Sequence, residues 1–367
     1  MQDTVFQPAF GNRPRNMVGR SSYIDRFKDA LKTNPGSRER TVLILGQRGY
    51  GKTVMLLEIA DIAKKQGYIV ASPTITGTGM LDRILEKIVE EGKSYIKKNK
   101  VKITGGNLNV LGFGAGVQVS GSNEEPHSFA YRLTELSRQL TKNGLGILIL
   151  IDEVQASHEE LKQLIIAYQE IIGEGGNIAI VMAGLPGAVS STLNNNVLTF
   201  LNRARKIDLG PLNIRDVYAY YKNTFKEMNL KISDELCREA ADYTEGSPYM
   251  MQLIGHNIII YSGNEALCDE NTLDSALTDS KEDYINDIGK TTINALSDKD
   301  VEFLIAMIPD NDSSSISDIT QRMGVTSAYA QLYKRRLLEA GVIEQVGRGK
   351  VKYSVAYLKE YLERIAD

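Results

Sequence analysis

A glycine-rich segment directly after an apolar one is the feature that most constrains this chain. Residues 41–45 read TVLIL, and residues 46–53 read GQRGYGKT, which has the spacing GxxxxGK(S/T). The order predicts a buried strand, a tight turn and then a helix, because glycine accepts backbone dihedrals that a Cβ would forbid. Such a turn directs backbone N–H groups inward at the positive end of a helix, where phosphate oxygens bind. The segment is therefore interpreted as a phosphate-binding loop.

The residues of this loop have separate expected tasks. Lys52 would reach the β- and γ-phosphates of a nucleotide, and the hydroxyl of Thr53 would ligate Mg²⁺. The predicted phosphate-binding residues are Gly46, Gln47, Arg48, Gly49, Tyr50, Gly51, Lys52 and Thr53. The alternative is an ordinary strand-turn-helix unit, since the spacing alone is found in many proteins.

A second apolar segment ends in two acidic residues. Residues 146–151 read GILILI and are followed by Asp152 and Glu153. Asp152 would hold the metal through its water shell, and Glu153 would orient and deprotonate the attacking water. The alternative is a core strand that ends in a helix-capping acid. Because two separate parts of one site occur in the same chain, we favour the catalytic interpretation, in which Lys52 and Glu153 are catalytic residues.

The composition is that of a large globular protein in a reducing compartment. The chain has 367 residues, of which 42% are hydrophobic, so it is long enough for two or three domains. The net charge of -3 excludes a globally basic nucleic-acid coat and leaves room only for a local basic patch. Two cysteines, Cys237 and Cys268, argue against a disulfide framework. The start lacks a signal-peptide pattern and no segment approaches the roughly 18 apolar residues of a membrane helix, so we expect a cytoplasmic protein without membrane contact.

Strands and helices alternate up to about residue 210. The expected helices are residues 53–66, 79–98, 125–142 and 159–172, and further strands are expected at residues 68–72 and 178–182. The alternation predicts an α/β fold, a P-loop NTPase parallel sheet with helices on both faces and ligands at the carboxyl ends of the strands. Residues 1–210 are the predicted nucleotide-binding domain. Within it, a β-hairpin is predicted at about residues 100–123, either as a surface ornament or as a loop that touches DNA or a neighbouring subunit.

The rest of the chain predicts two further domains. Residues 211–290 show apolar residues at helical spacing and are interpreted as a helical lid that caps the nucleotide. Its expected helices are residues 213–228, 233–244, 247–260 and 271–287. Residues 291–367 have the element order of a winged helix-turn-helix domain. Its expected elements are helices at residues 296–307, 317–323 and 327–340, a loop at residues 310–315, and strands at residues 341–345 and 350–355.

Basic residues gather on the third helix and the wing of this C-terminal domain. The candidate contacts to double-stranded DNA are Gln331, Lys334, Arg335, Arg336, Arg348 and Lys350. Their side chains would reach phosphates and base edges. Acidic residues elsewhere keep the domain close to neutral, so the alternative is a solvated charged helix on a module that binds protein.

The chain as a whole resembles a known group of ATPases. Met17, Val18, Gly19 and Arg20, followed by a predicted helix at residues 22–31, resemble the "VGR" box of AAA+ and related STAND ATPases of the initiator, or origin-recognition, type. The resemblance also covers the phosphate loop, the acidic strand, the lid and the winged helix, in the same order. It implies that Val18, Gly19 and Arg20 border the adenine of ATP or ADP, and that Mg²⁺ accompanies the nucleotide.

The resemblance also implies a contact between subunits. Arg203 or Arg205, just before the lid, matches the arginine finger that reaches a neighbour's γ-phosphate. Such a finger acts only between chains, so it implies a homo-oligomer in the ATP-bound state. The alternative for both residues is ordinary basic surface at the end of a helix.

Two departures from the family pattern lower the expected rate of hydrolysis. The sensor strand ends in MAGLP at residues 182–186, without a polar side chain for the γ-phosphate, and Tyr249 stands near the position of the lid's second sensor, usually an arginine. We expect a nucleotide-dependent DNA-binding switch whose ATPase activity is slow. The alternative is a STAND-type signalling ATPase whose terminal domain binds a protein partner. A small-molecule kinase is disfavoured, because no acceptor pocket is evident and the winged helix would be unexplained.

Overall fold

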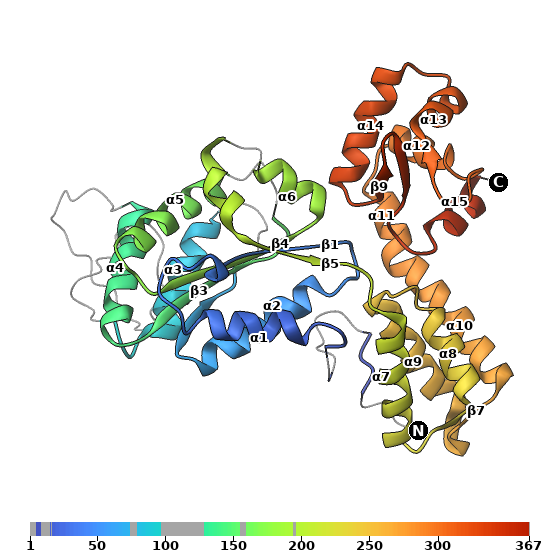
Figure 1. The fold of residues 1–367 in the computed structure, drawn as a ribbon, viewed down its shortest axis with the longest axis horizontal. Helices are drawn as coiled ribbons and strands as arrows, with labels where there is room; N and C mark the ends of the chain where they lie inside the picture. Colours follow the sequence, from blue (N-terminus) through green and yellow to red (C-terminus); the bar gives the residue numbers. More distant parts are fainter. Residues whose placement is uncertain are drawn as a thin grey trace, which may run out of the picture.

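The protein consists of a layered α/β part followed by a helical part. In the computed structural model, residues 5–8, 15, 17–73, 79–96, 128–154, 159–193 and 196–366 are described, and the predicted hairpin lies outside the described residues. Figure 1 shows the α/β part built from the first half of the chain and the helical part built from the second half. None of the helices within these ranges combines the length and the apolar character that crossing a membrane requires.

Five parallel strands form the centre of the α/β part. They are β1 (Thr41–Gly46), β2 (Tyr68–Ala71), β3 (Gly146–Ile151), β4 (Ile178–Gly184) and β5 (Arg205–Leu209), in the spatial order β2-β3-β4-β1-β5. All neighbouring pairs run parallel, and their β-branched and leucine side chains suit a sheet buried on both faces. The predicted P-loop NTPase sheet is confirmed. The sequence analysis did not identify β5, which forms the edge beside β1.

Helices cover both faces of the sheet, because successive strand residues point to opposite faces. Val42 and Ile44 of β1 pack with one layer of helices, whereas Leu43 packs with the other. The first layer contains α1 (Ser21–Ala30) and α2 (Lys52–Lys65); the second contains α3 (Met80–Gly92), α4 (Phe129–Lys142) and α5 (Glu159–Gly173). Figure 1 shows α1 and α2 on one side of the sheet and α4 and α5 on the other. After β4, the helix α6 (Pro186–Leu193) and the 3-10 helix η2 (Asn196–Arg203) lead to β5.

Four helices follow the sheet. They are α7 (Ile214–Glu227), α8 (Asp234–Asp242), α9 (Pro248–Ser262) and α10 (Glu270–Tyr284). Each begins after a side chain that accepts a hydrogen bond from a first-turn N–H group, which would otherwise lack a partner. These capping residues are Asn213, Ser233, Ser247 and Asp269. The four predicted helices are present, with ends shifted by one to three residues. Two short strands, β6 (Lys231–Ile232) and β7 (Leu267–Cys268), pair in parallel beside them.

An N-terminal segment packs against these helices. Phe6 is 2% exposed, and its ring centroid lies 5.8 Å from that of Tyr220 and 5.7 Å from that of Phe225. The backbone N–H of Gln7 donates to the side-chain oxygen of Gln252 at 3.0 Å. Residues that precede the α/β part in sequence therefore contribute to the core of the helical part, which the sequence analysis did not anticipate.

A small module, here called the C-terminal module (residues 298–366), ends the chain. It consists of α12 (Asp298–Ile305), β8 (Ser314–Ser315), α13 (Ile316–Met323), α14 (Ser327–Glu339), β9 (Ile343–Gly347), β10 (Lys350–Tyr353) and α15 (Leu358–Ala366). β10 pairs antiparallel with both β8 and β9. The prediction of a loop throughout residues 310–315 was wrong at Ser314 and Ser315, because a two-residue strand leaves no periodic signal in a sequence. The sequence analysis did not identify α15.

The helical part and the C-terminal module share buried apolar residues. A π-helical segment (Ile285–Lys290) and the short α11 (Thr291–Asn294) connect α10 to the module. One buried cluster contains Phe6 and residues from Leu212 to Leu362, and so continues across the predicted domain boundary at residue 290. The boundaries at residues 210 and 290 stay predictions.

Candidate functional site

The candidate site lies where three neighbouring strands end. β1 runs into the glycine-rich loop after Gly46, and β3 ends immediately before Asp152. Both strands pair with β4, so their carboxyl ends meet at one edge of the sheet. Parallel sheets bind ligands at this edge. The two motifs found in the sequence are therefore brought to one place.

Two predicted metal ligands are in direct contact. The Thr53 hydroxyl donates to Oδ2 of Asp152 at 2.6 Å. Thr53 lies in the first turn of α2, whereas Asp152 follows a strand that is buried along its whole length. Hydroxyl and carboxylate oxygens are the donors that Mg²⁺ accepts in nucleotide sites, so the residues present fit this ion.

Lys52 is held against the loop that it follows. Gly49 and Gly51 have φ values of +78° and +83°, a region that L side chains rarely adopt, and so their backbones form the turn into α2. The Lys52 ammonium donates to the backbone oxygens of Gly46 at 2.9 Å and Gln47 at 2.8 Å. Burial lowers the pKa of Lys52 to about 8, although Asp152 acts in the opposite direction. The pKa of Lys52 therefore lies close to physiological pH.

Glu153 has an unusual backbone conformation. Its φ is +55°, the left-handed region that is unfavourable for residues with a Cβ, and its N–H donates to Oδ1 of Asp152 at 2.9 Å. Its side chain is exposed, which leaves the carboxylate accessible to water beside the Thr53 and Asp152 pair. Strain of this kind is concentrated at functional sites.

The strand between the two motifs ends without a polar side chain. β4 finishes with Ala183 and Gly184, and the N–H of Val154 donates to the backbone oxygen of Ala183 at 2.9 Å. A Cβ at Gly184 would lie 3.0 Å from Cγ2 of Val189, so this strand end is closely packed and apolar.

Residues from the helical part lie against the tip of the loop. A Cβ at Gly49 would lie 3.5 Å from Cβ of Tyr249, 3.8 Å from the hydroxyl of Tyr284 and 4.0 Å from Oγ of Ser247. Tyr249 donates its hydroxyl to Asp287 at 2.5 Å, and burial raises the pKa of Tyr284 to about 12. Tyr284 therefore keeps its proton at neutral pH. The sequence analysis missed Tyr284, because no local pattern relates it to a loop so distant in the chain.

The VGR box lies between the sheet and the helical part. Gly19 has a φ of +66°, and a Cβ there would be 3.5 Å from Oδ2 of Asp216 and 3.7 Å from Cδ2 of Leu212. Arg20 is 8% exposed, and its guanidinium donates to the backbone oxygen of Gly210, just after β5. Burial lowers the pKa of Arg20. Arg20 thus stabilises the connection between the sheet and the helices. The contact of Val18, Gly19 and Arg20 with adenine stays a prediction.

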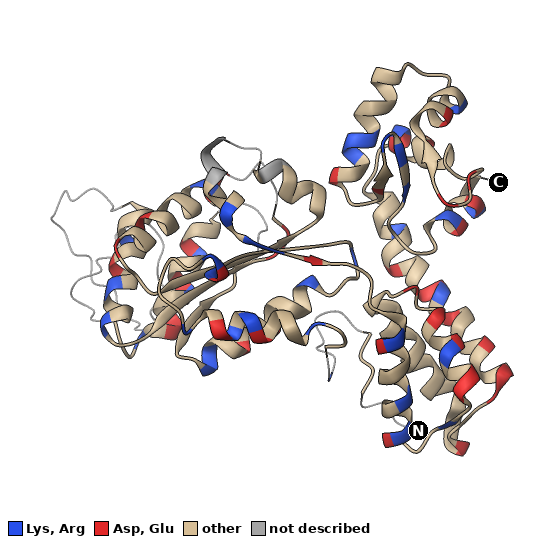
Figure 2. Cartoon of the chain, in the orientation of Figure 1, with Lys and Arg blue, Asp and Glu red and all other residues tan. Residues whose placement is uncertain are grey.

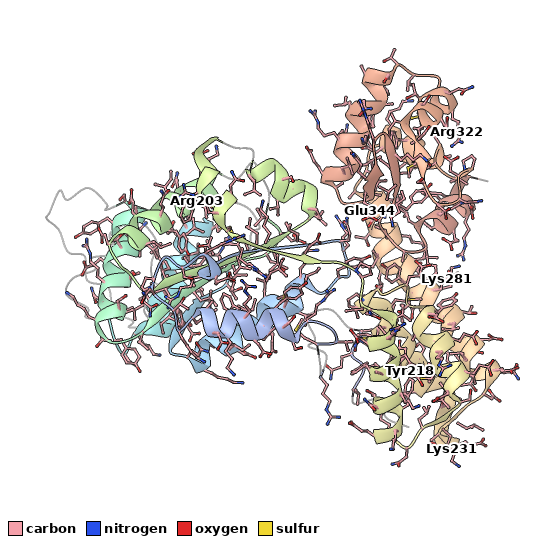
Figure 3. All side chains as sticks on the ribbon, in the orientation of Figure 1. Arg203, Tyr218, Lys231, Lys281, Arg322 and Glu344 are labelled. Carbon is pink, nitrogen blue, oxygen red and sulfur yellow. The ribbon has the colours of Figure 1, made fainter. Side chains whose placement is uncertain are left out.

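The two candidate finger residues differ in their surroundings. Arg203 is the last residue of η2 and is exposed (Figure 3). Arg205 is the first residue of β5, and its guanidinium lies 3.8 Å from the carboxylate of Glu39 in the same chain. Arg203 is therefore the better placed of the two to reach a second chain, and the finger itself stays a prediction.

One of the candidate DNA contacts is engaged inside the C-terminal module. Arg336 on α14 donates to Asp300 on α12 at 2.8 Å, and the Asp300 side chain is only 2% exposed. Its guanidinium also lies 5.2 Å from the ring centroid of Tyr333. This pair fastens α14 to α12, which the sequence could not indicate.

The other candidate DNA contacts lie on α14 and on the β9–β10 hairpin. Gln331, Arg335, Arg348 and Lys350 are exposed, and Lys334 is half-buried. Figure 2 shows basic residues on α14 and on the hairpin; Glu339 at the end of α14 and Glu344 on β9 are acidic. The structure therefore leaves two groups of basic side chains on the elements that were predicted to carry them.

Two family models match parts of the chain. Residues 16–181 match the AAA ATPase domain, which covers the loop, the acidic strand end and β4 up to residue 181. Residues 288–362 match a domain of unknown function, DUF8462. No curated protein matches the sequence.

Solved structures that resemble this chain cover nearly its whole length. The Walker-type ATPase paby2304 of Pyrococcus abyssi has a TM-score of 0.69 and 15% identity, over 98% of this chain and 99% of that one. The ORC2 protein of Aeropyrum pernix, in its ADPNP–ADP complexes, has a TM-score of 0.64 and 14% identity, over 98% and 96%. Its ADP form has a TM-score of 0.55 with the same identity and coverage. At this identity the likeness shows a shared fold, that of a P-loop NTPase.

The lowered pKa of Lys52 predicts the pH dependence of nucleotide binding. Below about pH 8 the ammonium is charged and the affinity should stay level. Above that pH, Lys52 must take up one proton from the solvent when a nucleotide binds, so the affinity should fall about tenfold per pH unit. A titration with fluorescent ADP between pH 7 and 9.5 measures this fall. Lys52→Arg is the control, because a guanidinium stays charged throughout; identical pH profiles for the two proteins would contradict the assignment.

The pair between Arg336 and Asp300 predicts different effects for two neighbouring arginines. Arg336→Ala leaves a buried carboxylate without its cation and should lower the free energy of unfolding by about 1–3 kcal/mol, a value reduced by the partial exposure of the guanidinium. Arg335→Ala removes an exposed side chain and should change it by less than about 0.5 kcal/mol. Urea denaturation followed by circular dichroism compares the two. Equal midpoints would show that the pair is not important for stability.

Proposed function

We propose that this chain is an ATP-binding, slowly hydrolysing AAA+ type switch that couples its nucleotide state to DNA binding through a C-terminal winged helix. The observation that carries the nucleotide part is the meeting of Lys52, Thr53 and Asp152 at the carboxyl edge of a P-loop NTPase sheet. The match of residues 16–181 to the AAA ATPase domain supports it, as does the nucleotide in the ORC2 protein that shares the fold.

The residues of the site suit phosphoryl transfer to water. Backbone N–H groups of residues 46–53 and the Lys52 ammonium would surround the phosphates, where positioned charge supplies most of the catalysis. Thr53 and Asp152 would hold Mg²⁺, which neutralises phosphate charge when bound. Glu153, with its exposed carboxylate, would accept the proton of the attacking water.

Slow turnover is proposed from what surrounds the γ-phosphate position. β4 ends in Ala183 and Gly184, which offer no side-chain hydrogen bond to a phosphate. Tyr249 stands in place of an arginine and donates its hydroxyl to Asp287. Fewer charges stabilise the transition state in such a site, so the identity of the bound nucleotide would persist and could serve as the signal.

The DNA-binding part of the proposal rests on the C-terminal module. Its order of elements, α12, β8, α13, α14, β9 and β10, supports a winged helix in which α14 is the recognition helix and the β9–β10 hairpin is the wing. Gln331, Lys334 and Arg335 would face DNA from α14, with Arg348 and Lys350 on the wing. Since the whole chain has a net charge of -3, this local group would supply most of the attraction to phosphates.

Assembly and location are also proposed. Arg203, exposed at the end of η2, would reach the γ-phosphate of a neighbouring chain in an ATP-bound homo-oligomer. Cys237 and Cys268 are both free and buried, which supports a cytoplasmic, reducing environment.

A second candidate function is a STAND-type signalling ATPase whose C-terminal module binds a protein. Two apolar side chains favour it: Leu332 on α14 is 42% exposed and Val346 on β9 is 45% exposed. Apolar side chains next to arginine are common in protein interfaces. The two functions share the nucleotide site and differ in what α14 and the hairpin contact.

Glu153→Gln tests the catalytic assignment. The amide keeps the size of the side chain but cannot accept the proton, so the variant should bind ATP as the parent does while phosphate release falls at least about 100-fold. Glu159→Gln, an exposed substitution at the start of α5, is the matched control and should keep the parental rate. If Glu153→Gln hydrolyses ATP at the parental rate, Glu153 is not the base.

DNA binding separates the two candidate functions. Labelled duplex DNA should bind the parental protein with an affinity that depends on whether ADP or a non-hydrolysable ATP analogue is present and that falls steeply with salt. Arg335→Ala should weaken binding by about 1–3 kcal/mol if the contact is to a base, or lower the salt slope by about one if it is to a phosphate. Arg364→Ala removes the same charge from α15, where it pairs with Glu282, and should have little effect. Absence of binding at low salt in both nucleotide states would favour the signalling function.

A further inference from the structure

One short segment of the C-terminal module lies against the nucleotide-binding part. We call residues 338–344, at the end of α14 and the start of β9, the elbow. A Cβ at Gly187, in the first turn of α6, would lie 2.4 Å from Cα of Glu339 and 2.4 Å from the backbone oxygen of Leu338. Since no side chain separates them, the backbones of the elbow and of α6 are in direct contact. α6 begins just after β4, beside the candidate site.

The tip of the elbow lies on the phosphate loop itself. Gly341 has a φ of +64°, and a Cβ there would lie 2.6 Å from Oε1 of Gln47 and 2.9 Å from Cδ2 of Leu185. A cavity of about 690 Å³ adjoins this contact and is lined by Gln47 and Tyr50 of the loop and by Glu344 of the elbow, among others. Figure 3 places Glu344 on the side of the C-terminal module that faces the rest of the protein.

The contact leaves one polar atom without a partner. Oε1 of Gln47 is buried and accepts no hydrogen bond from any described residue. A buried acceptor without a donor is destabilising, because it has lost its hydrogen bonds to water and no hydrogen bond within the protein replaces them. An arrangement in which Gln47 regains water or a donor would recover the free energy that is lost at this one atom.

The backbone of the same residue is tied to Lys52. The Lys52 ammonium donates to the backbone oxygens of Gln47 and Gly46. A phosphate in the loop would compete for the same N–H groups, and these two oxygens would then need to turn toward other donors. Occupancy of the loop thus acts directly on the residue whose side chain lies under Gly341.

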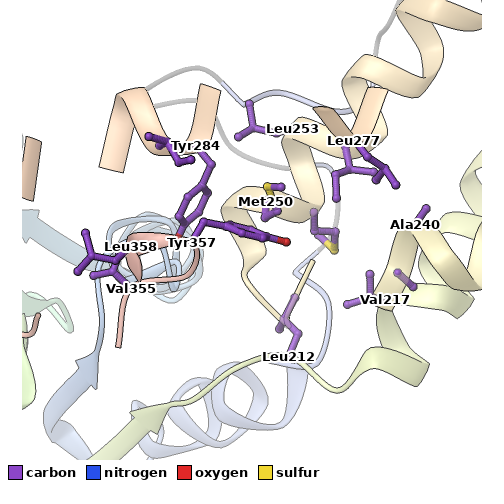
Figure 4. Packing of buried hydrophobic residues seen from close by; sticks show 14 of the residues in the cluster. Leu212, Val217, Ala240, Met250, Leu253, Leu277, Tyr284, Val355, Tyr357 and Leu358 are labelled. Atoms are coloured by element: carbon purple, nitrogen blue, oxygen red, sulfur yellow. The ribbon is translucent and has the colours of Figure 1, made fainter. Parts of the chain in front are cut away.

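The C-terminal module is also attached to the helical part. The Tyr357 ring lies 5.7 Å from that of Tyr243, its hydroxyl donates to the Tyr243 backbone oxygen, and the ammonium of Lys281 lies 4.9 Å from its centroid. Figure 4 shows Tyr357 beside Tyr284 in this packing. Tyr284 in turn approaches Gly49 of the loop. Release of the elbow would therefore leave the module attached to the helical part, and the two could change their orientation relative to the sheet together.

We propose that the contact between Gly341 and Gln47 holds the C-terminal module against the nucleotide-binding part, and that nucleotide bound in the phosphate loop releases it. The proposal rests on nucleotide binding in that loop, and it holds whether the module binds DNA or protein. Coupling of this kind is reciprocal: if nucleotide weakens the contact, weakening the contact strengthens nucleotide binding by the same factor.

Two glycine substitutions test the contact. Gly341→Ala places a methyl group against Gln47 and should displace the elbow. Gly349→Ala is the matched control, since Gly349 lies in the same module at a φ of +73° with nothing within 4 Å of its Cβ position. Both variants place an alanine at a positive φ, and only the first meets the phosphate loop. Hydrogen exchange of the peptides that contain residues 184–192 and 336–346 reports on the contact, and fluorescent ADP and ATP-analogue titrations report on the site.

In the parental protein, nucleotide should speed exchange in both peptides. In Gly341→Ala, exchange should already be fast without nucleotide, and nucleotide affinity should rise about fivefold or more, whereas Gly349→Ala should match the parent. Equal affinities of the two variants, together with exchange in the parent that nucleotide does not change, would overturn the proposal while the nucleotide site stands. A parental protein that binds no nucleotide would overturn the proposed function as well.

Discussion

The hydrogen bond between Thr53 and Asp152 shows the constraint on which the rest of the structure depends. These residues follow β1 and β3, and they meet because both strands pair in parallel with β4. A strand order that placed β3 far from β1 would separate the phosphate loop from the acid that completes it. The helical part and the C-terminal module are then arranged around the same edge, where Tyr284 and Gly341 approach the loop. The candidate nucleotide site and the contacts of the helical part and the C-terminal module thus lie at the same edge of the sheet.

Glycine decides where other parts of the protein come close to this edge. Gly49 leaves room for the helical part, and Gly187 and Gly341 let the elbow touch α6 and the loop. At each of these glycines a backbone lies directly against another backbone or against side chains of a distant element, with no side chain of its own between them. The tyrosines around Tyr357 then keep the C-terminal module attached. The C-terminal module is thus joined to the helical part around Tyr357, and it contacts the nucleotide-binding part through the elbow.

Sequence reasoning identified residue types better than their partners. Lys52, Thr53 and Asp152 could be predicted because one motif and one strand end specify them locally. Arg20 and Arg336 were predicted to contact ligands, and those contacts stay predictions; in the structure both donate to groups of their own chain, Gly210 and Asp300. Arginine makes strong hydrogen bonds to any nearby acceptor, so its role depends on what the fold places beside it. A basic residue in a sequence indicates a capacity to bind, and the fold selects the acceptor.

The sequence by itself determined the parallel α/β class, the phosphate loop and the order of elements along the chain, because apolar periodicity and glycine spacing act over a few residues. Only the tertiary structure decided that β5 closes the sheet beside β1, that Phe6 packs into the helical part and that Gly341 lies on Gln47. These contacts join residues far apart in the chain, and the sequence around either residue does not specify its partner. Their pairing follows from strand order and from the packing of whole elements, which no local pattern records.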